Sequence, residues 1–485
     1  MTVARPITES ELSSSEINAN GMQREFSSFR DPSGFLVWRG EEIFRCVGLG
    51  YKRQFQHATE SGLYTKLVRD GLLLPFTETG NIFGFPECHT VLKPTLVSQI
   101  TYPYEWCFEQ LKDAAILTLQ AHSRALEHGM VLKDASAYNV QMLGAGRPRL
   151  IDHLSFDFLA DHGAWPAYGQ FCRNFLAPLA LMSYTDASLG RLMQIYIDGI
   201  PLDLASRLLP LPTKFRLGLQ MHVHLHAKMI SSYGRSETKV KYRSLSREQM
   251  MAVACSLERT VHRLEPNKRK TNWSDYALCS GYTSSGIEAK LTAVRGMVER
   301  VKPSVIWDIG GNDGTYSRPL SDCVERIICM DTDPVAVNRN YALCRNAHIG
   351  NVFPMIVDFT SPSPGIGFAN RERLSLEGRG KPDLVMALAL IHHLSITHNL
   401  PMSYIASYLA ELCRHLIIEF VPPNDPQVRR LVLNRKQIHN DYTEDSFRSI
   451  FGRHFSTLQE LSVSNTDRRL FLMHRKACDA PNLGG

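Results

Sequence analysis

The chain has 485 residues, more than one hydrophobic core usually holds, so its length favours two domains. A hydrophobic content of 44% is typical of a globular protein, and a formal net charge of +6 is too weak to indicate a nucleic-acid partner. The 11 cysteines form no C-x-x-C pair, which favours reduced thiols in a cytoplasmic protein over a disulfide framework. No apolar run is long enough to span a membrane, and the first residues do not have the pattern of a secretory signal.

The first half of the chain predicts a tail followed by an α+β domain. Residues 1–28 are rich in Ser, Glu and Asn without periodicity, which is typical of a disordered tail, and residues 29–233 mix strand-like and helix-like runs. Apolar residues at helical spacing predict a helix over Glu105–Glu127, and Phe171–Tyr184 predicts a buried helix. Residues 234–272 are rich in Arg, Lys, Ser and Glu, so we expect a linker or an exposed helix there.

One loop of this domain has the spacing of a kinase catalytic loop. Asp134 precedes Asn139 by five residues, and Asp152 follows in an apolar, strand-like context. Kinases use such an Asp as base, and such an Asn and a later Asp as Mg²⁺ ligands. The region resembles protein-kinase-like and aminoglycoside-phosphotransferase-like enzymes, and the resemblance implies a kinase-like fold.

Other features of the same region depart from that pattern. Leu132-Lys133 stands where a His-Arg or His-Gly pair is usual, His153-Leu154 replaces Phe-Gly, and we find no convincing glycine-rich phosphate loop. Lys93 could serve as the phosphate-pairing lysine, but so could any lysine near a strand. A loop and hairpin stabilised by Asp and Asn turn chemistry is the alternative, and we do not expect active phosphotransfer.

Two further patterns look chemical but predict structure. His222, His224 and His226 alternate, as metal ligands on a strand would, yet the surrounding run is helical, and alternate helical residues do not converge. Trp165 and Phe171 belong to an aromatic stripe that we interpret as core packing. The sequence therefore predicts no metal site.

From residue 273 to residue 476, short β-branched runs alternate with helical stretches. The strand-like runs are VIWDIG at 305–310, RIICMD at 326–331, VFPMIVD at 352–358, DLVMALAL at 383–390 and HLIIEFV at 415–421. This alternation predicts βαβ units and a parallel sheet. A helix near Thr443–Phe451 and two late strands, at 456–462 and 469–474, complete an α/β domain, which is followed by a tail at 477–485.

The strongest chemical signal is the segment VIWDIGGNDGTYS. A strand ends at Asp308, a turn with Gly310, Gly311, Asp313 and Gly314 follows, and the pattern predicts a helix from Thr315. Glycines let a backbone turn sharply and approach a ligand, and open α/β folds bind nucleotides at the carboxyl edge of the sheet. The turn matches neither the dinucleotide fingerprint nor a P-loop.

This segment resembles motif I of class I S-adenosylmethionine (SAM)-dependent methyltransferases, which have a doubly wound Rossmann-like sheet. The resemblance implies that Asp308 and the glycine turn hold the amino-acid part of SAM, that Asp331 accepts hydrogen bonds from the ribose, and that Asp358-Phe359 meets the adenine. The stretch that begins at Ala387 resembles motif IV of small-molecule methyltransferases. Taken singly, each of these residues could instead be an ordinary turn or helix-cap residue.

Methyl transfer to a hydroxyl needs a base, and three residues are candidates. His392 and His393 follow the fourth strand, and Glu419 ends the fifth. A His pair can also be packing, and Glu419 can also be the partner of a nearby Arg. Trp273–Tyr282 is a candidate cofactor lid, although core packing explains its aromatic residues equally well.

With YPYEW at Tyr102–Trp106 and LKDASAYN at Leu132–Asn139, the whole chain resembles a bacterial two-part methyltransferase-like family that includes a rhizobial host-specific nodulation protein. The resemblance implies methylation of a small-molecule or glycan-related acceptor in host-specific nodulation. The alternative is a kinase-like and methyltransferase-fold protein that binds or regulates without catalysis. A nucleic-acid methyltransferase is disfavoured, because the [DNS]-P-P-[YF] tetrad is absent and the charge is modest.

Overall fold

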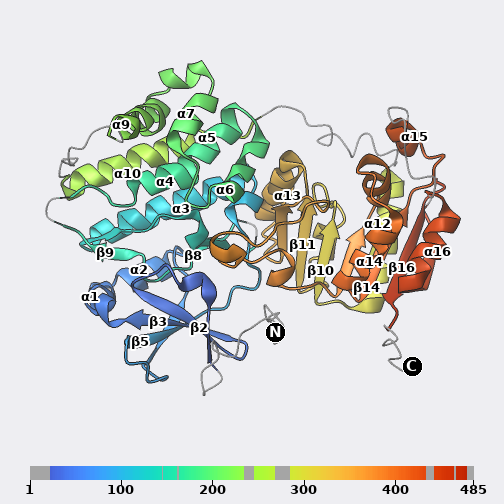
Figure 1. Cartoon of the computed structure of the whole chain (residues 1–485), viewed down its shortest axis with the longest axis horizontal. Coiled ribbons are helices and arrows are strands. Elements are labelled where there is room, and N and C mark those ends of the chain that lie inside the picture. Colours follow the sequence, from blue (N-terminus) through green and yellow to red (C-terminus); the bar gives the residue numbers. More distant parts are fainter. Residues whose placement is uncertain are drawn as a thin grey trace. The chain divides into compact units, whose positions relative to one another are not determined.

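The computed structural model describes residues 22–144, 146–160, 163–233, 245–267, 284–432, 442–463 and 466–477 (Figure 1). The chain divides into two compact units. The N-terminal unit comprises the described residues before 270 together with Pro364–Arg379, and the C-terminal unit comprises the others. No helix within the described ranges is long and apolar enough to cross a membrane.

The N-terminal unit begins with a five-stranded antiparallel sheet in the order β1-β2-β3-β5-β4. Its strands are β1 (Met22–Arg24), β2 (Gly34–Arg39), β3 (Glu42–Gly48), β4 (Phe76–Gly80) and β5 (Cys88–Pro94). Helices α1 (Lys52–Glu60) and α2 (Leu63–Arg69) connect β3 to β4. The sheet has a small apolar cluster of its own, formed by Met22, Val37, Phe44, Cys46, Cys88 and Val91.

The tail predicted over residues 1–28 is too long by several residues. Strand β1 already begins at Met22, which is buried and pairs with Arg39 of β2. Residues 1–21 lie outside the described residues. A three-residue edge strand is too short to show periodicity, so only its pairing with β2 reveals it.

A larger, mostly helical part completes this unit. Its helices are α3 (Phe108–Glu127), α4 (Tyr168–Phe171), α5 (Ala177–Tyr184), α6 (Leu192–Ile195), α7 (Leu202–Leu208), α8 (Leu217–Leu219), α9 (His226–Tyr233) and α10 (Arg247–His262). Two short strand pairs hold the kinase-like loop: β6 (Met130–Leu132) with β9 (Phe156–Phe158), and β7 (Val140–Met142) with β8 (Pro148–Leu150). An antiparallel sheet with helices between its third and fourth strands in sequence, followed by a helical part with this loop, is a kinase-like arrangement.

The helical predictions for this unit hold in part. The predicted helix over Glu105–Glu127 is α3, and Phe171–Tyr184 is a buried helix with a π-helical turn in its first half. Of the linker or exposed helix expected at 234–272, Arg247–His262 form helix α10, one face of which is buried in the core of the unit. That face carries Met250, Ala254, Leu257 and Val261 at helical spacing, and the charged residues of the segment lie between these positions.

The aromatic and histidine patterns are structural. Trp165 is buried, and its ring stacks on His122 with centroids 4.0 Å apart. His222 bonds to Ser256 and His224 to Thr213, at 3.0 Å in both cases, so these two rings have separate partners.

The C-terminal unit is built on a seven-stranded sheet in the order β12-β11-β10-β13-β14-β16-β15. Its strands are β10 (Val305–Ile309), β11 (Arg326–Asp331), β12 (Val352–Ile356), β13 (Leu384–Ala387), β14 (His415–Phe420), β15 (Phe455–Ser462) and β16 (Arg469–Arg475). The first five strands pair in parallel, and β16 pairs antiparallel with both β14 and β15. This strand order is that of the class I methyltransferase fold, and all seven predicted strands are present.

Five helices accompany this sheet in the described residues (Figure 1). They are α12 (Ser284–Val301), α13 (Pro334–Asn346), α14 (Met402–Leu412), α15 (Pro426–Val432) and α16 (Glu444–His454). The helix predicted from Thr315 is wrong, because turns and a single 3₁₀ turn at Arg318–Leu320 connect β10 to β11. Pro319 has no backbone N–H and restricts the residue before it, so an α-helix from Thr315 would be broken within its first two turns.

The segment Pro364–Arg379 lies between β12 and β13 in the sequence but belongs to the N-terminal unit. Its last residue forms a buried two-pronged ion pair: Arg379 Nη2 lies 2.5 Å from Glu105 Oε1, and Arg379 Nη1 lies 2.8 Å from Glu105 Oε2. Both side chains are only 1% exposed. The Tyr102 hydroxyl also accepts a hydrogen bond from the Leu374 N–H at 2.9 Å. Tyr102 and Glu105 of the YPYEW motif thus bind the segment Pro364–Arg379.

The buried pair predicts a large stability loss on truncation. Replacing Arg379 with Met leaves the Glu105 carboxylate buried without its cation, and we expect the N-terminal unit to lose about 3 to 5 kcal/mol of unfolding free energy. Urea unfolding followed by tryptophan fluorescence measures this. The matched control is Arg207→Met, which removes an exposed pair with Asp203 and should change little. Equal unfolding free energies of the two variants would contradict a stabilising role of the buried Arg379–Glu105 pair.

Candidate active site

A cavity opens at the carboxyl ends of the parallel strands of the C-terminal unit. Its lining follows β10, β11, β12 and β13, and consists of Ile309, Gly310, Asn312, Asp331, Thr332, Val357, Asp358, Phe359, Thr360, Leu388, Ala389, Leu390, His393, Leu394, Thr397 and His398. Parallel strands of one sheet end at the same edge, so four segments distant in sequence meet there. The cavity has one acid from the end of β11 and one from the segment after β12.

Asp331 ties two parts of this edge together. Its Oδ2 accepts a hydrogen bond from the Asn312 N–H at 2.8 Å, and its Oδ1 accepts one from the Asp333 N–H at 2.9 Å. Burial raises the pKa of Asp331 to about 6, although these backbone donors oppose the rise. The carboxylate therefore sits close to its titration point under mildly acidic conditions.

The turn after β10 needs unusual backbone angles. Gly310 has φ +74°, and a Cβ there would lie 3.1 Å from Leu390 Cδ1, on the wall of the cavity. Asn312 has φ +49°, a left-handed conformation that Asn tolerates better than most residues. Ala389, which also lines the cavity, has φ +50°, which costs about 1 to 3 kcal/mol for such a residue. Backbone strain of this kind clusters at functional sites.

Asp358 and Phe359 lie on the cavity wall. Asp358 Oδ1 accepts hydrogen bonds from the Thr360 N–H at 2.9 Å and the Thr360 hydroxyl at 2.6 Å, which fixes the carboxylate. The Phe359 ring packs against Tyr408, with centroids 5.3 Å apart. The wall after β12 thus offers one flat apolar ring and one oriented acid.

Several predicted cofactor residues support the turn without lining the cavity. Asp308 is buried, its Oδ2 accepts a hydrogen bond from the Ser317 hydroxyl at 2.5 Å, and burial raises its pKa to about 6. Thr315 donates to Asp313 at 2.6 Å. Gly311, Gly314 and Ala387 also lie outside the lining. A sequence pattern predicts that such residues share one loop, but only the folded loop decides which of them faces the cavity.

The two predicted histidines differ. His393 lines the cavity and starts a π-helical segment, His393–Thr397, a helix type frequently found at functional sites. Burial lowers its pKa to about 4, so the ring is neutral at physiological pH. His392 is fully buried away from the cavity, and neither of its ring nitrogens has a hydrogen-bond partner among the described residues. Burial holds the pKa of His392 well below its usual value.

Glu419 is the anion of a buried charge cluster. Its Oε2 lies 2.5 Å from Lys290 Nζ of α12, and its Oε1 lies 3.8 Å from Arg468 Nη1. Arg468 also binds Asp425 at 2.8 Å. A carboxylate held by two cations is a poor proton acceptor, so this cluster fits the alternative of an arginine partner. Trp273–Tyr282, the candidate lid, lies outside the described residues.

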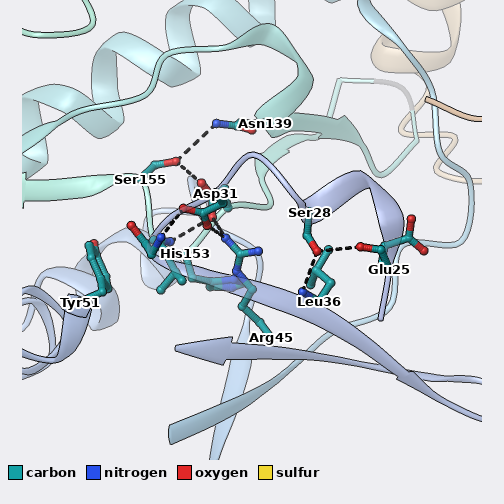
Figure 2. A network of polar contacts seen from close by, with 12 residues as sticks. Glu25, Ser28, Asp31, Leu36, Arg45, Tyr51, Asn139, His153 and Ser155 are labelled. Atoms are coloured by element: carbon teal, nitrogen blue, oxygen red, sulfur yellow. Dashed lines mark hydrogen bonds and ion pairs between the residues drawn. The ribbon is translucent and has the colours of Figure 1, made fainter. Parts of the chain in front are cut away.

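The kinase-like loop of the N-terminal unit brings two of its three predicted residues, Asn139 and Asp152, to the hydroxyl of Ser155; Figure 2 shows Asn139 and Ser155. Asp152 Oδ2 accepts a hydrogen bond from the Ser155 hydroxyl at 2.5 Å, and the Asn139 amide donates to the same hydroxyl at 3.4 Å. Asp134 instead binds the Gln170 amide at 2.7 Å. Lys93 lies on β5 at the surface and pairs with Glu42, so it does not face Asp152.

Sequence reasoning missed the residues that complete both sites. Asn312 and Thr332 directly follow predicted positions, and their place beside a strand end was a usable signal. Arg45 of β3 is the cation that meets Asp152, at 3.0 Å. No signal in the sequence singles out Arg45, because a strand arginine is ordinarily a surface residue. Among the described residues, no group of three or more His, Cys, Asp or Glu side chains could hold a metal ion.

We predict opposite effects on stability for alanine substitutions of two glycines, one in the turn after β10 and one in α12. Gly314 has φ +74°, and a Cβ there would lie 2.3 Å from Asn340 Oδ1, so Gly314→Ala should lower the stability of the C-terminal unit by about 1 to 3 kcal/mol. Gly296→Ala is the matched control. Gly296 is an exposed residue of α12 with open space around it, and alanine there should add about 0.5 to 1 kcal/mol. Denaturant unfolding followed through the buried Trp307 decides; a gain at both positions would contradict this picture.

Comparison with known proteins finds similarity along nearly the whole chain. The nodulation protein NoeA of Rhizobium meliloti (strain 1021) is 34% identical over 468 residues, which cover 93% of this chain and 96% of NoeA. No family model matches the sequence.

Solved structures cover less of the chain. Magnesium protoporphyrin IX methyltransferase (ChlM) from Synechocystis PCC 6803 is 19% identical with a TM-score of 0.31, and the match covers 40% of this chain and 84% of ChlM. N-methyltransferase NodS from Bradyrhizobium japonicum WM9 is 14% identical with a TM-score of 0.29, covering 40% of this chain and 97% of NodS. The bifunctional kinase-methyltransferase WbdD is 14% identical with a TM-score of 0.30, covering 42% of each chain.

The fold assignment rests on the strand order of the C-terminal unit, and the family assignment rests on the extent of the sequence match. That match spans more of the chain than either unit alone provides. The chain belongs to the family of the nodulation protein NoeA.

Proposed function

We propose that this protein is a SAM-dependent methyltransferase that acts on a small-molecule or glycan-related acceptor in host-specific nodulation. The observation that carries the proposal is the cavity in which Gly310, Asp331 and Asp358 meet at one edge of the sheet. The nodulation role is supported by the family relationship to NoeA.

The residues of the cavity fit an adenosyl ligand. A backbone without a Cβ at Gly310 leaves room that a larger residue would fill, since its Cβ would lie 3.1 Å from Leu390 Cδ1. Asp331 presents a carboxylate that can accept hydrogen bonds from two adjacent ribose hydroxyls. Phe359 offers a ring face to a planar base, and Asp358 can accept a hydrogen bond from an exocyclic amine.

The remaining residues would act on the acceptor. Bound SAM would supply an electrophilic sulfonium methyl group. His393 lines the same cavity as a neutral ring and can accept a proton from a hydroxyl acceptor. Leu388, Leu390 and Leu394 give that wall an apolar surface that excludes water and aligns the acceptor.

Glu419 and His392 have supporting roles in this proposal. Glu419 pairs with the buried Lys290 and Arg468, and His392 packs beside His393 with ring centroids 4.1 Å apart. The positive charges of Lys290 and Arg468 disfavour protonation of His392 and help to keep it neutral. Because His393 lines the cavity and His392 does not, we assign proton acceptance to His393 alone.

Calorimetry with SAM tests the cofactor assignment. We expect wild-type protein to bind SAM, and Asp331→Asn to bind it about 10- to 100-fold more weakly, because the charged hydrogen bonds to the ribose are lost. Wild-type affinity should also fall as the pH drops below about 6, because the ribose hydroxyls need the ionised Asp331 and its pKa is raised to about 6. The Asp331→Asn variant should show a flatter pH profile.

The matched control is Asp445→Asn, which changes an exposed acid in the first turn of α16 and should leave SAM affinity unchanged. Asp308 titrates in the same range but does not line the cavity, and it is intact in both variants. If wild-type protein above pH 7 does not bind SAM, the alternative of a binding or regulatory protein without catalysis gains support.

Metabolite profiling tests the reaction itself. A deletion strain should accumulate a compound lighter by one methyl group than its wild-type counterpart, and the wild-type gene should restore methylation. His393→Gln should restore it poorly while SAM affinity stays near normal, since loss of general-base catalysis lowers rates by about 10²- to 10⁴-fold. His262→Gln, an exposed histidine of α10, is the control that should restore fully. Full restoration by His393→Gln would remove His393 from the mechanism.

A further inference from the structure

The kinase-like fold of the N-terminal unit raises a separate question about metal. Kinase folds hold Mg²⁺ with an Asp beyond the catalytic loop and an Asn within it. In this chain these residues are Asp152 and Asn139, which both contact the Ser155 hydroxyl. Their contacts decide whether the site suits a divalent cation.

Both oxygens of Asp152 already have strong partners. Oδ1 lies 3.0 Å from Arg45 Nη2 and accepts the Leu154 N–H at 3.1 Å, while Oδ2 accepts the Ser155 hydroxyl at 2.5 Å. Asn139 directs its amide nitrogen, not its carbonyl oxygen, at Ser155. A metal needs oxygen lone pairs from both residues. The side chains therefore do not fit the ion.

Arg45 provides the positive charge beside Asp152. It is 6% exposed, and it lies on β3, the strand that carries the phosphate-pairing lysine in kinases. In kinases an acid of the helix after that strand holds the lysine. Here α2 contains no acid, and Glu60 is the last residue of α1. The carboxylates that bind Arg45 are Asp152 and Asp31.

Asp31 adds a second negative charge where a phosphate loop would lie. It belongs to the connection between β1 and β2, which kinases use to cover the phosphates with glycine backbone. Its Oδ1 accepts the Ser33 N–H at 2.8 Å, and Ser33 in turn accepts a hydrogen bond from Lys133 Nζ at 2.7 Å. The loop therefore presents a fixed carboxylate to Arg45, as Figure 2 shows.

We infer that Arg45 is a built-in replacement for the divalent cation of the kinase-like unit. Its guanidinium binds Asp152 and Asp31 together and cannot lose its proton in a protein. The unit therefore binds no Mg²⁺ at Asp152 and transfers no phosphate. Removal of the Arg45 charge should turn the same two carboxylates into a metal site.

Manganese binding to the full-length protein tests this inference. Electron paramagnetic resonance of free Mn²⁺ should show no ion bound through Asp152 in wild-type protein, with or without ATP. Arg45→Gln should gain one Mn²⁺ with an affinity at least about tenfold higher than wild type, because a cation no longer repels the ion. The double variant Arg45→Gln/Asp152→Asn should lose that ion again.

The control is Arg45→Lys, which keeps a positive charge and should stay without metal. The inference is overturned if wild-type protein binds Mn²⁺ or Mn²⁺·ATP and Asp152→Asn abolishes that binding. It is also overturned if folded Arg45→Gln, checked by circular dichroism, gains no ion. If Arg45→Gln does not fold, wild type, Arg45→Lys and Asp152→Asn are compared instead. Mn²⁺ binding that depends on Asp152 in wild type or in Arg45→Lys, which both carry a cation at position 45, refutes the inference.

Discussion

The C-terminal site depends on one carboxylate, that of Asp331. Its two oxygens bind the backbone of the turn after β10, through the Asn312 N–H, and the first residues of the next turn, through the Asp333 N–H. Because β10 and β11 are parallel neighbours, both turns emerge at the same sheet edge. The acid thereby fixes the glycine-containing turn and faces the cavity at the same time, which couples the shape of the site to its charge.

The two units treat buried charge differently. In the C-terminal unit, Glu419 is paired with Lys290 and Arg468, and none of these three residues lines the cavity. In the N-terminal unit, Arg45 is held by Asp31 and Asp152 at the very place where a kinase-like fold would bind metal. Buried ions are costly unless paired, and in each cluster the buried cation meets a carboxylate. The Glu419 cluster therefore has a structural role, and the pairing of Arg45 with Asp31 and Asp152 excludes a metal ion.

Much of the C-terminal fold was visible in the sequence, because each parallel strand is a continuous apolar run with a polar residue at its carboxyl end. Asp331, Asp358 and Phe359, which the resemblance to methyltransferases implies as cofactor residues, line the cavity. Asp308 also lies near the end of an apolar strand, but its side chain is buried and accepts a hydrogen bond from the Ser317 hydroxyl. The fold of the turn that follows the strand decides where such a side chain points. Apolar periodicity did not indicate that the predicted helix from Thr315 is absent, although Pro319 was a local signal against that helix.

The sequence by itself determined the positions of the strands along the chain, the position of the glycine-containing turn and the spacing of the kinase-like loop. These properties are local: they depend on periodicity and turn chemistry within a few residues. Tertiary structure alone decided which acids meet, that Arg45 rather than Lys93 reaches Asp152, and that Arg379 returns to pair with Glu105. Each of these contacts joins residues far apart in sequence, and the energy of a charge depends on its surroundings after folding, which no local pattern contains.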